Sequence, residues 1–127
     1  MMRRYRSVVR RRSAAALGAC ALGCAPLALT PCVSADATAY LVNVTVRPGY
    51  HFASAQDALG YGYGICDKVS GGRPYAQLVG DVKADFATDD EFHASYLIGQ
   101  AVNELCPAQI WQLRNSAAHY RPPPGAT

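Results

Sequence analysis

Residues 88–107 have the sequence TDDEFHASYLIGQAVNELCP, which combines a helix start, an apolar stripe and a Cys-Pro end in one stretch. Its apolar residues recur every three or four positions, which predicts an amphipathic helix. Thr88 is placed to cap the helix, and Glu91, three residues later, is placed to complete a capping box with it. The acidic residues at the helix start also complement the helix dipole. Cys106 ends the helix, because Pro107 prevents its direct continuation. The predicted buried stripe is Ala94, Leu97, Ile98, Ala101 and Leu105.

The cysteine at the end of this helix has one evident partner. The chain has five cysteines, and only Cys66 and Cys106 lie beyond an apolar N-terminal segment. One pair in a small exported domain is most simply one disulfide. We expect a structural bridge, since redox centres usually present close pairs such as Cys-x-x-Cys. The bridge would close a loop of roughly 40 residues and contribute about 4 kcal/mol.

Three further helices are predicted around this one. A helix capped by Ser54 and Asp57 should run to Gly71-Gly72. A second should begin at Pro74, and a short last one should span Ala108–Ala118. In the first of these helices, the residues expected to be buried are Ala55, Leu59, Tyr63, Cys66 and Val69. In the second they are Tyr75, Leu78, Val79, Val82 and Phe86, and in the last they are Ile110, Leu113 and Ala117.

Residues 36–53 have a mixed pattern. A helix could open at Asp36, whereas the alternation of Val42, Val44 and Val46 is also typical of a strand. We favour the helix, since a single short strand would have no evident partner. Pro48-Gly49 ends either element.

Three glycines, Gly60, Gly62 and Gly64, interrupt the helix that carries Cys66. A phosphate-binding loop would need a strand before it and a helix after it, and neither is evident. We therefore interpret the glycines as sites of close helix packing, with Tyr61 and Tyr63 filling the space beside them.

The N-terminus has the three parts of a secretory signal. Six arginines precede an apolar run from Ala14 to about Leu29, and small residues follow up to Ala35. We predict that residues 1–35 form a signal peptide, cleaved between Ala35 and Asp36. Lipid attachment at Cys20 or Cys24 is the alternative.

A transmembrane anchor is disfavoured, because Pro26 and Pro31 cut the apolar run short of the roughly 20 residues that a span needs. Removing 35 of the 127 residues leaves 92, which form one predicted domain at 36–120 and a flexible tail at 121–127. Those 92 residues carry six basic and nine acidic residues, a net charge of −3. A nucleic-acid partner is therefore not expected.

No catalytic, cofactor or metal site is predicted. Asp89 and His93 share one helix face, but two ligands make a weak metal site, and we interpret them as a solvated helix start. His51 and His119 belong to no recognisable nucleophile motif. A small enzyme would require His51 and His93 to meet at a pocket with an acid.

Trp111 is the only tryptophan and follows Ile110 on the last predicted helix. We favour a role for Trp111 as a lid over the small core. The alternative is that Ile110 and Trp111 form an interaction surface, since tryptophan is enriched at interface hot spots.

The motifs Gly64-Ile65-Cys66 and Ala101-Val102-Asn103-Glu104-Leu105-Cys106-Pro107 resemble domain-of-unknown-function family 732. Tyr40-Leu41 and Tyr96-Leu97-Ile98 are similar to its aromatic-Leu pair and its apolar triplet. The resemblance spans about residues 37–115. It implies a small, helical, disulfide-bonded, exported protein of mycolic-acid actinobacteria, and it implies no activity or catalytic residues.

The sequence thus predicts an all-α fold, a small bundle of four to five short helices joined by one disulfide. We expect a secreted or cell-envelope protein, lipid-anchored in the alternative, without enzymatic activity or cofactor and with no membrane span once the signal is removed. Its expected role is to bind another envelope or extracellular protein. The alternative is a carrier of a small apolar molecule or lipid, with a cavity lined by the glycines and tyrosines near Cys66.

Overall fold

The computed structural model describes residues 33–125, and within them it contains helices and no strand. The helices are α1 (Val33–Val46), α2 (Ala55–Ser70), α3 (Tyr75–Asp85), α4 (Glu91–Leu105) and α5 (Ile110–Ala117). A 3-10 turn at Pro107–Gln109 separates α4 from α5. The all-α prediction is confirmed. Most of the predicted signal peptide, with Cys20 and Cys24, lies outside the described residues, and Ala35 and Asp36 fall at the start of α1.

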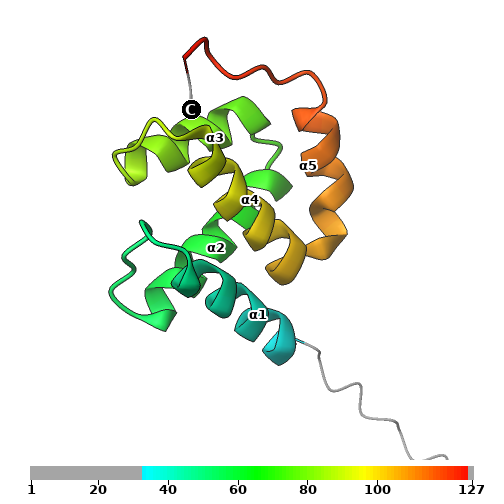
Figure 1. Cartoon of the computed structure of the whole chain (residues 1–127). Helices are drawn as coiled ribbons and strands as arrows, with labels where there is room; N and C mark the ends of the chain where they lie inside the picture. The colour runs from blue at the N-terminus through cyan, green and yellow to red at the C-terminus, as the bar shows by residue number, and fades with distance from the viewer. Residues whose placement is uncertain (1–32, 126–127) are drawn as a thin grey trace, which may run out of the picture.

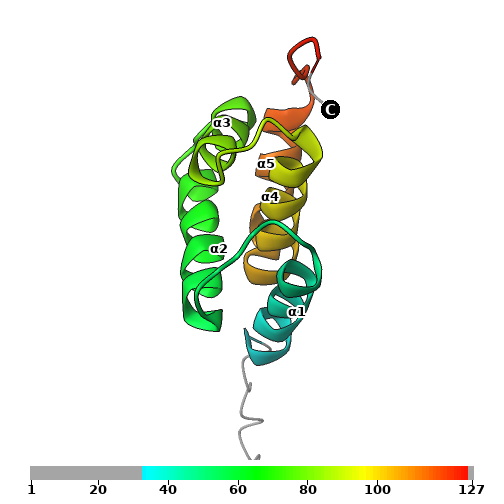
Figure 2. The ribbon, with the colours of Figure 1, turned by 60° about the vertical axis from the view of Figure 1, so that its left-hand side comes forward.

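Helix α4 is the centre of the fold, and it contacts α1, α2, α3 and α5 (Figure 1). Figure 2 shows α2 and α3 along one side of the molecule and α4, α5 and α1 along the other. The beginning of α1 and the C-terminal tail lie at opposite ends in both views. The most deeply buried side chains of α4 are Ala94, Leu97, Ile98, Ala101 and Val102, each 0% exposed.

The segment with the mixed pattern forms helix α1, so the strand alternative is wrong. Tyr40 and Val44 lie four residues apart and are buried, whereas Val42 and Val46 are exposed on the opposite side. The valines thus alternate in sequence but lie on different faces of a helix. Burial of Tyr40 and Val44 holds α1 against the rest of the core.

Helix α2 begins as predicted, but its buried face is rotated. The Ser54 hydroxyl accepts a hydrogen bond from the Asp57 N–H and donates one to its carboxylate. Ala55 and Tyr63, expected inside, are exposed. The buried residues are Ala58, Gly62, Ile65, Cys66 and Val69. Gly62 lies on the buried face because Tyr40 packs closely against it. A hydrophobicity pattern cannot predict such a contact, since it does not show which distant residue approaches a glycine.

Helix α3 buries the predicted stripe, with Leu78, Val79 and Val82 inside. Pro74 is its N-cap, one residue before the helix. Asp81 lies on the opposite face and accepts from the Arg73 guanidinium at 2.6 Å and from Lys68 Nζ at 3.0 Å. These hydrogen bonds lower the pKa of Asp81, that from Arg73 most.

The N-cap of α4 is Asp90 rather than Thr88. Asp90 Oδ1 accepts from the N–H groups of Phe92 and His93 at 2.8 and 3.1 Å. Thr88 Oγ1 instead accepts from the Asp90 N–H. Glu91 does not close a capping box, since its carboxylate binds Lys83 and the Tyr120 hydroxyl.

Candidate functional site

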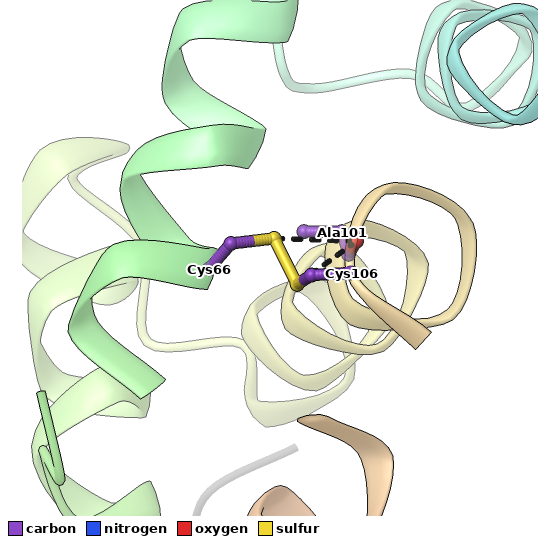
Figure 3. Close-up of a disulfide and its surroundings, with 3 residues drawn as sticks. All are labelled: Cys66, Ala101 and Cys106. Carbon is purple, nitrogen blue, oxygen red and sulfur yellow. Dashed lines mark hydrogen bonds between the residues drawn. A yellow bond between two sulfur atoms is a disulfide. The ribbon is translucent and has the colours of Figure 1, made fainter. Parts of the chain in front are cut away.

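The disulfide predicted from the sequence is present. Cys66 on α2 and Cys106 at the end of α4 are joined, with an S–S distance of 2.08 Å and Cα atoms 6.1 Å apart (Figure 3). Both sulfur atoms lie 3.8 Å from the carbonyl oxygen of Ala101. Oxidised sulfur carries no proton to donate, so these are packing contacts. The bridge lies between two helices, with Cys66 buried and Cys106 partly buried, which is the setting of a structural disulfide.

Of the three glycines in α2, only Gly62 is a packing site. A Cβ at Gly62 would lie 2.5 Å from Leu105 Cδ1 and 2.7 Å from Tyr40 Cζ, whereas one at Gly60 or Gly64 would meet nothing within 4 Å. The Tyr40 hydroxyl donates to the carbonyl of Ala58 at 3.0 Å, and burial raises the pKa of Tyr40. The packing interpretation is therefore confirmed for Gly62 and wrong for its two neighbours.

The predicted space-filling tyrosines have other surroundings. Tyr61 extends toward α3, and its hydroxyl donates to Asp85 at 2.8 Å. Burial, followed by this hydrogen bond, raises the pKa of Tyr61. Tyr63 is among the exposed large side chains.

His93 is buried, which makes the prediction of a solvated helix start wrong at this residue. Its side chain is 8% exposed, and the Tyr50 ring lies over it with the ring centroids 4.1 Å apart. The Tyr50 hydroxyl donates to the His93 carbonyl at 2.8 Å. Burial raises the pKa of Tyr50 to about 12. Periodicity missed His93 because the loop after α1, and not another helix, covers it.

The imidazole of His93 has an unusual environment. Nε2 is buried without a hydrogen-bond partner among the described residues. Gly49, at a φ of +108°, approaches so closely that a Cβ there would lie 2.8 Å from His93 Cε1. Burial, and then the positive charge of Arg47, lower the pKa of His93, while Asp90 acts in the opposite direction.

The other histidines do not join His93 in a site. His51 is exposed and lines a groove between α1, the following loop and the first turn of α2, whereas His93 does not line it. His119 is exposed near the C-terminus. No acidic residue lines the groove, and no group of three or more potential metal ligands occurs among residues 33–125.

The groove has a volume of about 410 Å³ and mostly apolar walls. Leu41 and Val44 of α1, Phe52 of the loop and Ala55 and Ala58 of α2 contribute to it. The glycines and tyrosines in the middle of α2, expected to line a cavity, do not line this groove. None of the described helices is long and apolar enough to cross a membrane.

Trp111 is 70% exposed, so the prediction of a lid over the core is wrong. Ile110 and Leu113 turn toward the core as predicted, and Trp111, one residue after Ile110, therefore faces outward. The guanidinium carbon of Arg114 lies 5.5 Å from the Trp111 ring centroid. Of the pair proposed as an interaction surface, Trp111 is open to solvent and Ile110 packs against the core.

A second cation–aromatic group, partly buried at the surface, was not found from the sequence. Arg47, just after α1, places its guanidinium carbon 4.6 Å from the Phe92 ring centroid and 4.7 Å from that of Tyr96. Phe92 and Tyr96 are four residues apart on α4 and lie off its predicted buried stripe. That spacing was the available signal, but it does not identify the arginine that would join them.

The comparison with known proteins agrees with the resemblance seen in the motifs. Residues 35–108 match the family model described as "Protein of unknown function (DUF732)", and the matched region includes both bridged cysteines and all of α2, α3 and α4. No curated protein and no solved structure matches the chain. Since the family model covers more than half of the sequence, the chain belongs to the DUF732 family.

Proposed function

We propose that this protein is an exported, non-enzymatic binding module of the cell envelope or extracellular space, and that it binds a protein partner through Trp111. The N-terminal signal pattern supports export. The disulfide between Cys66 and Cys106 supports it too, since such bridges persist in oxidising compartments. Lipid attachment at Cys20 or Cys24 is the alternative to free export.

The observation that carries the proposed binding role is the exposure of Trp111. A tryptophan buries about 150–250 Å² when it is covered, and leaving most of that area in water is unfavourable. Arg114 lies against its ring, and tryptophan and arginine are the residue types most enriched at interface hot spots. Helix α5 packs through Ile110 and Leu113, so it presents Trp111 on a supported surface.

The proposal can be tested by placing a photo-crosslinking amino acid at position 111 in cells and, as a matched control, at exposed Tyr63 on α2. We expect a crosslinked protein specific to position 111. The purified partner should then bind the Trp111→Ala variant at least tenfold more weakly than the wild type, because truncation of a hot-spot residue costs about 2 kcal/mol or more. Equal crosslinking at both positions, or unchanged affinity of Trp111→Ala, would contradict the proposal.

A carrier of a small apolar molecule is the second candidate, and the groove beside α1 favours it. Its volume of about 410 Å³ lies within the range typical of small-molecule sites. Ala55→Trp places a large ring in this groove. If the protein is a carrier, a fluorescent fatty acid should bind saturably to the wild type and not to Ala55→Trp, while Trp111→Ala should bind it normally.

A further inference from the structure

The cluster of Arg47, Phe92 and Tyr96 is a second surface feature, separate from Trp111, in which Phe92 is exposed and the other two side chains are partly buried. The guanidinium of Arg47 lies within 5 Å of two ring centroids, which are themselves 6.1 Å apart. The Tyr96 hydroxyl donates to the Asn43 carbonyl of α1 at 3.3 Å, so the cluster joins the end of α1 to the start of α4. Stacking against two rings reduces the freedom of the arginine before any ligand arrives.

The arginine in this cluster has no acidic partner among the described residues. The ion pairs within residues 33–125 join Lys68 and Arg73 to Asp81, and Lys83 to Glu91. Asp90 accepts from backbone N–H groups instead, and exposed Asp89 makes no ion pair with Arg47. Arg47 Nε is buried and makes no hydrogen bond to the described residues. The Tyr50 hydroxyl is a polar neighbour of the Arg47 side chain, but it carries no negative charge at neutral pH. On a domain with net charge −3, a guanidinium held in place without an acidic partner is the complement of an external anion.

The surroundings of Arg47 indicate what kind of anion fits. Phe92 is 61% exposed, and Val46, next to Arg47 in the chain, is 73% exposed. One guanidinium matches the single charge of a carboxylate and can bind it through two parallel hydrogen bonds. A phosphate carries more charge, and the negative domain offers no second basic residue in this cluster. The exposed apolar side chains favour an apolar residue beside the carboxylate.

We propose that Arg47, held by Phe92 and Tyr96, binds the side-chain carboxylate of an Asp or Glu in a partner polypeptide, with a neighbouring apolar side chain packed on Phe92. This site is distinct from the Trp111 surface, so its test is independent of the binding role proposed for Trp111. Arg47 also lines one edge of the groove beside α1, so the Ala55→Trp variant, which fills that groove, should still bind the carboxylate if the partner is a polypeptide. Arg47 supplies the charge and the bidentate geometry, and Phe92 supplies the apolar contact.

The test titrates two short peptides, acetyl-Leu-Glu-Leu-amide and acetyl-Leu-Gln-Leu-amide, into the purified oxidised protein, with NMR signals of the Arg47 Nε–H and Phe92 ring as readout. The Glu peptide should shift both signals saturably, with a dissociation constant in the millimolar range expected for so small a ligand. The Gln peptide should bind about tenfold more weakly, since a charge-assisted hydrogen bond is lost.

Variants assign the binding to the cluster. Arg47→Gln should reduce affinity for the Glu peptide about tenfold, and Arg47→Lys should restore only part of it, because lysine lacks the planar fork. Arg114→Gln removes the arginine of the other cation–aromatic pair and should leave binding unchanged. Circular dichroism should show each variant to be folded.

Three outcomes would overturn the proposal. One is equal binding of the Glu and Gln peptides, and another is undiminished binding by folded Arg47→Gln. The third is binding to vesicles of anionic phospholipid without binding to either peptide, which would assign the cluster to a lipid surface.

Discussion

Gly62 illustrates how a single residue sets the distance between two helices. Its missing side chain leaves the space that the Tyr40 ring and the Leu105 methyl group occupy. Tyr40 is fully buried, and the hydroxyl end of its ring lies against Gly62, from where the hydroxyl reaches the Ala58 carbonyl. One hydrogen atom in place of a methyl group thus allows α1 to dock.

Gly62→Ala should lower the free energy of unfolding by about 1–3 kcal/mol, as overpacked substitutions do. The new Cβ would lie 2.5 Å from Leu105 Cδ1 and 2.7 Å from Tyr40 Cζ, and the fully buried Tyr40 ring can give way only by displacing the residues packed around it. Gly60→Ala and Gly64→Ala are matched controls in the same helix with open space around them, and they should stabilise the protein by up to about 1 kcal/mol. Urea denaturation of the three variants measures the contrast. Equal effects at all three positions would refute this account of Gly62.

For single residues, the sequence predicted those features that depend on local chemistry. The Ser54 cap and the Cys66–Cys106 bridge were found because each depends on residue type and spacing. The three glycines could not be told apart, because their difference comes from Tyr40, about 20 residues away in the chain. His93 was placed wrongly for the same reason, since the covering ring belongs to Tyr50.

Among the structural elements, the loop between α1 and α2 is held down by aromatic rings. Tyr50 packs on His93 and Phe86, and Phe52 packs on Phe86 and Tyr61. The loop therefore contacts the end of α3 and the start of α4. The neutral form of His93 fits this environment, because its buried Nε2 has no acceptor for a second proton.

The loop should make the stability of the protein depend on pH. The pKa of His93 is lowered by burial and by Arg47, so below the unfolded value of about 6.5 the unfolded chain binds more protons than the folded one. The stabilisation is complete above about pH 6.5 and is lost as the pH falls through the lower folded pKa. Asp90 opposes this shift, while Tyr50 and Phe86 bring no charge at these pH values.

Urea denaturation at pH 7 and pH 5 should show a smaller free energy of unfolding at pH 5. Replacement of the imidazole in His93→Phe should reduce this difference, and exposed His119→Gln should retain it. A wild-type protein that is equally stable at both pH values, or a His93→Phe variant with the full difference, would contradict the role assigned to His93.

The presence of the helices was largely predictable from the sequence, but their end residues and the faces that they bury were less so. The stripe of α3 was identified because its residues follow the helical period without interruption. At α4, several consecutive residues can cap a helix, and local geometry selected Asp90 over Thr88. Helix α1 was ambiguous because its exposed face carries Val42 and Val46, which periodicity alone would bury.

For the molecule as a whole, the disulfide is the strongest single constraint. It joins residues 40 positions apart, and the loop that it closes contains all of α3 and α4. In the chain-entropy model such a loop contributes about 4 kcal/mol, a large share of the 5–15 kcal/mol that stabilises typical domains. The sequence predicted this connection because only one cysteine pair remained after the apolar N-terminal segment was set aside.

The double variant Cys66→Ala/Cys106→Ala should lose about 4 kcal/mol of unfolding free energy. The loss arises mainly because the unfolded chain gains freedom, so the helical circular dichroism of the folded variant should be preserved at low temperature. Wild-type protein in the presence of a reductant is the matched control and should unfold at the same urea concentration as the variant. An unchanged midpoint in both samples would show that the bridge contributes no stability.

The bridge also divides the chain into a covalent ring and two open arms. The ring runs from Cys66 to Cys106, and the arms before and after it carry Arg47 and Trp111. A protease cut inside the ring leaves two pieces that the disulfide still joins, whereas a cut in an arm can release the part of the arm beyond the cut. Apart from the backbone itself, each arm is held to the ring by packing and by hydrogen bonds, such as that of Tyr50 with His93 before the ring and that of Tyr120 with Glu91 after it. No covalent cross-link fixes either arm, so an arm can separate from its packing surface while the ring stays closed.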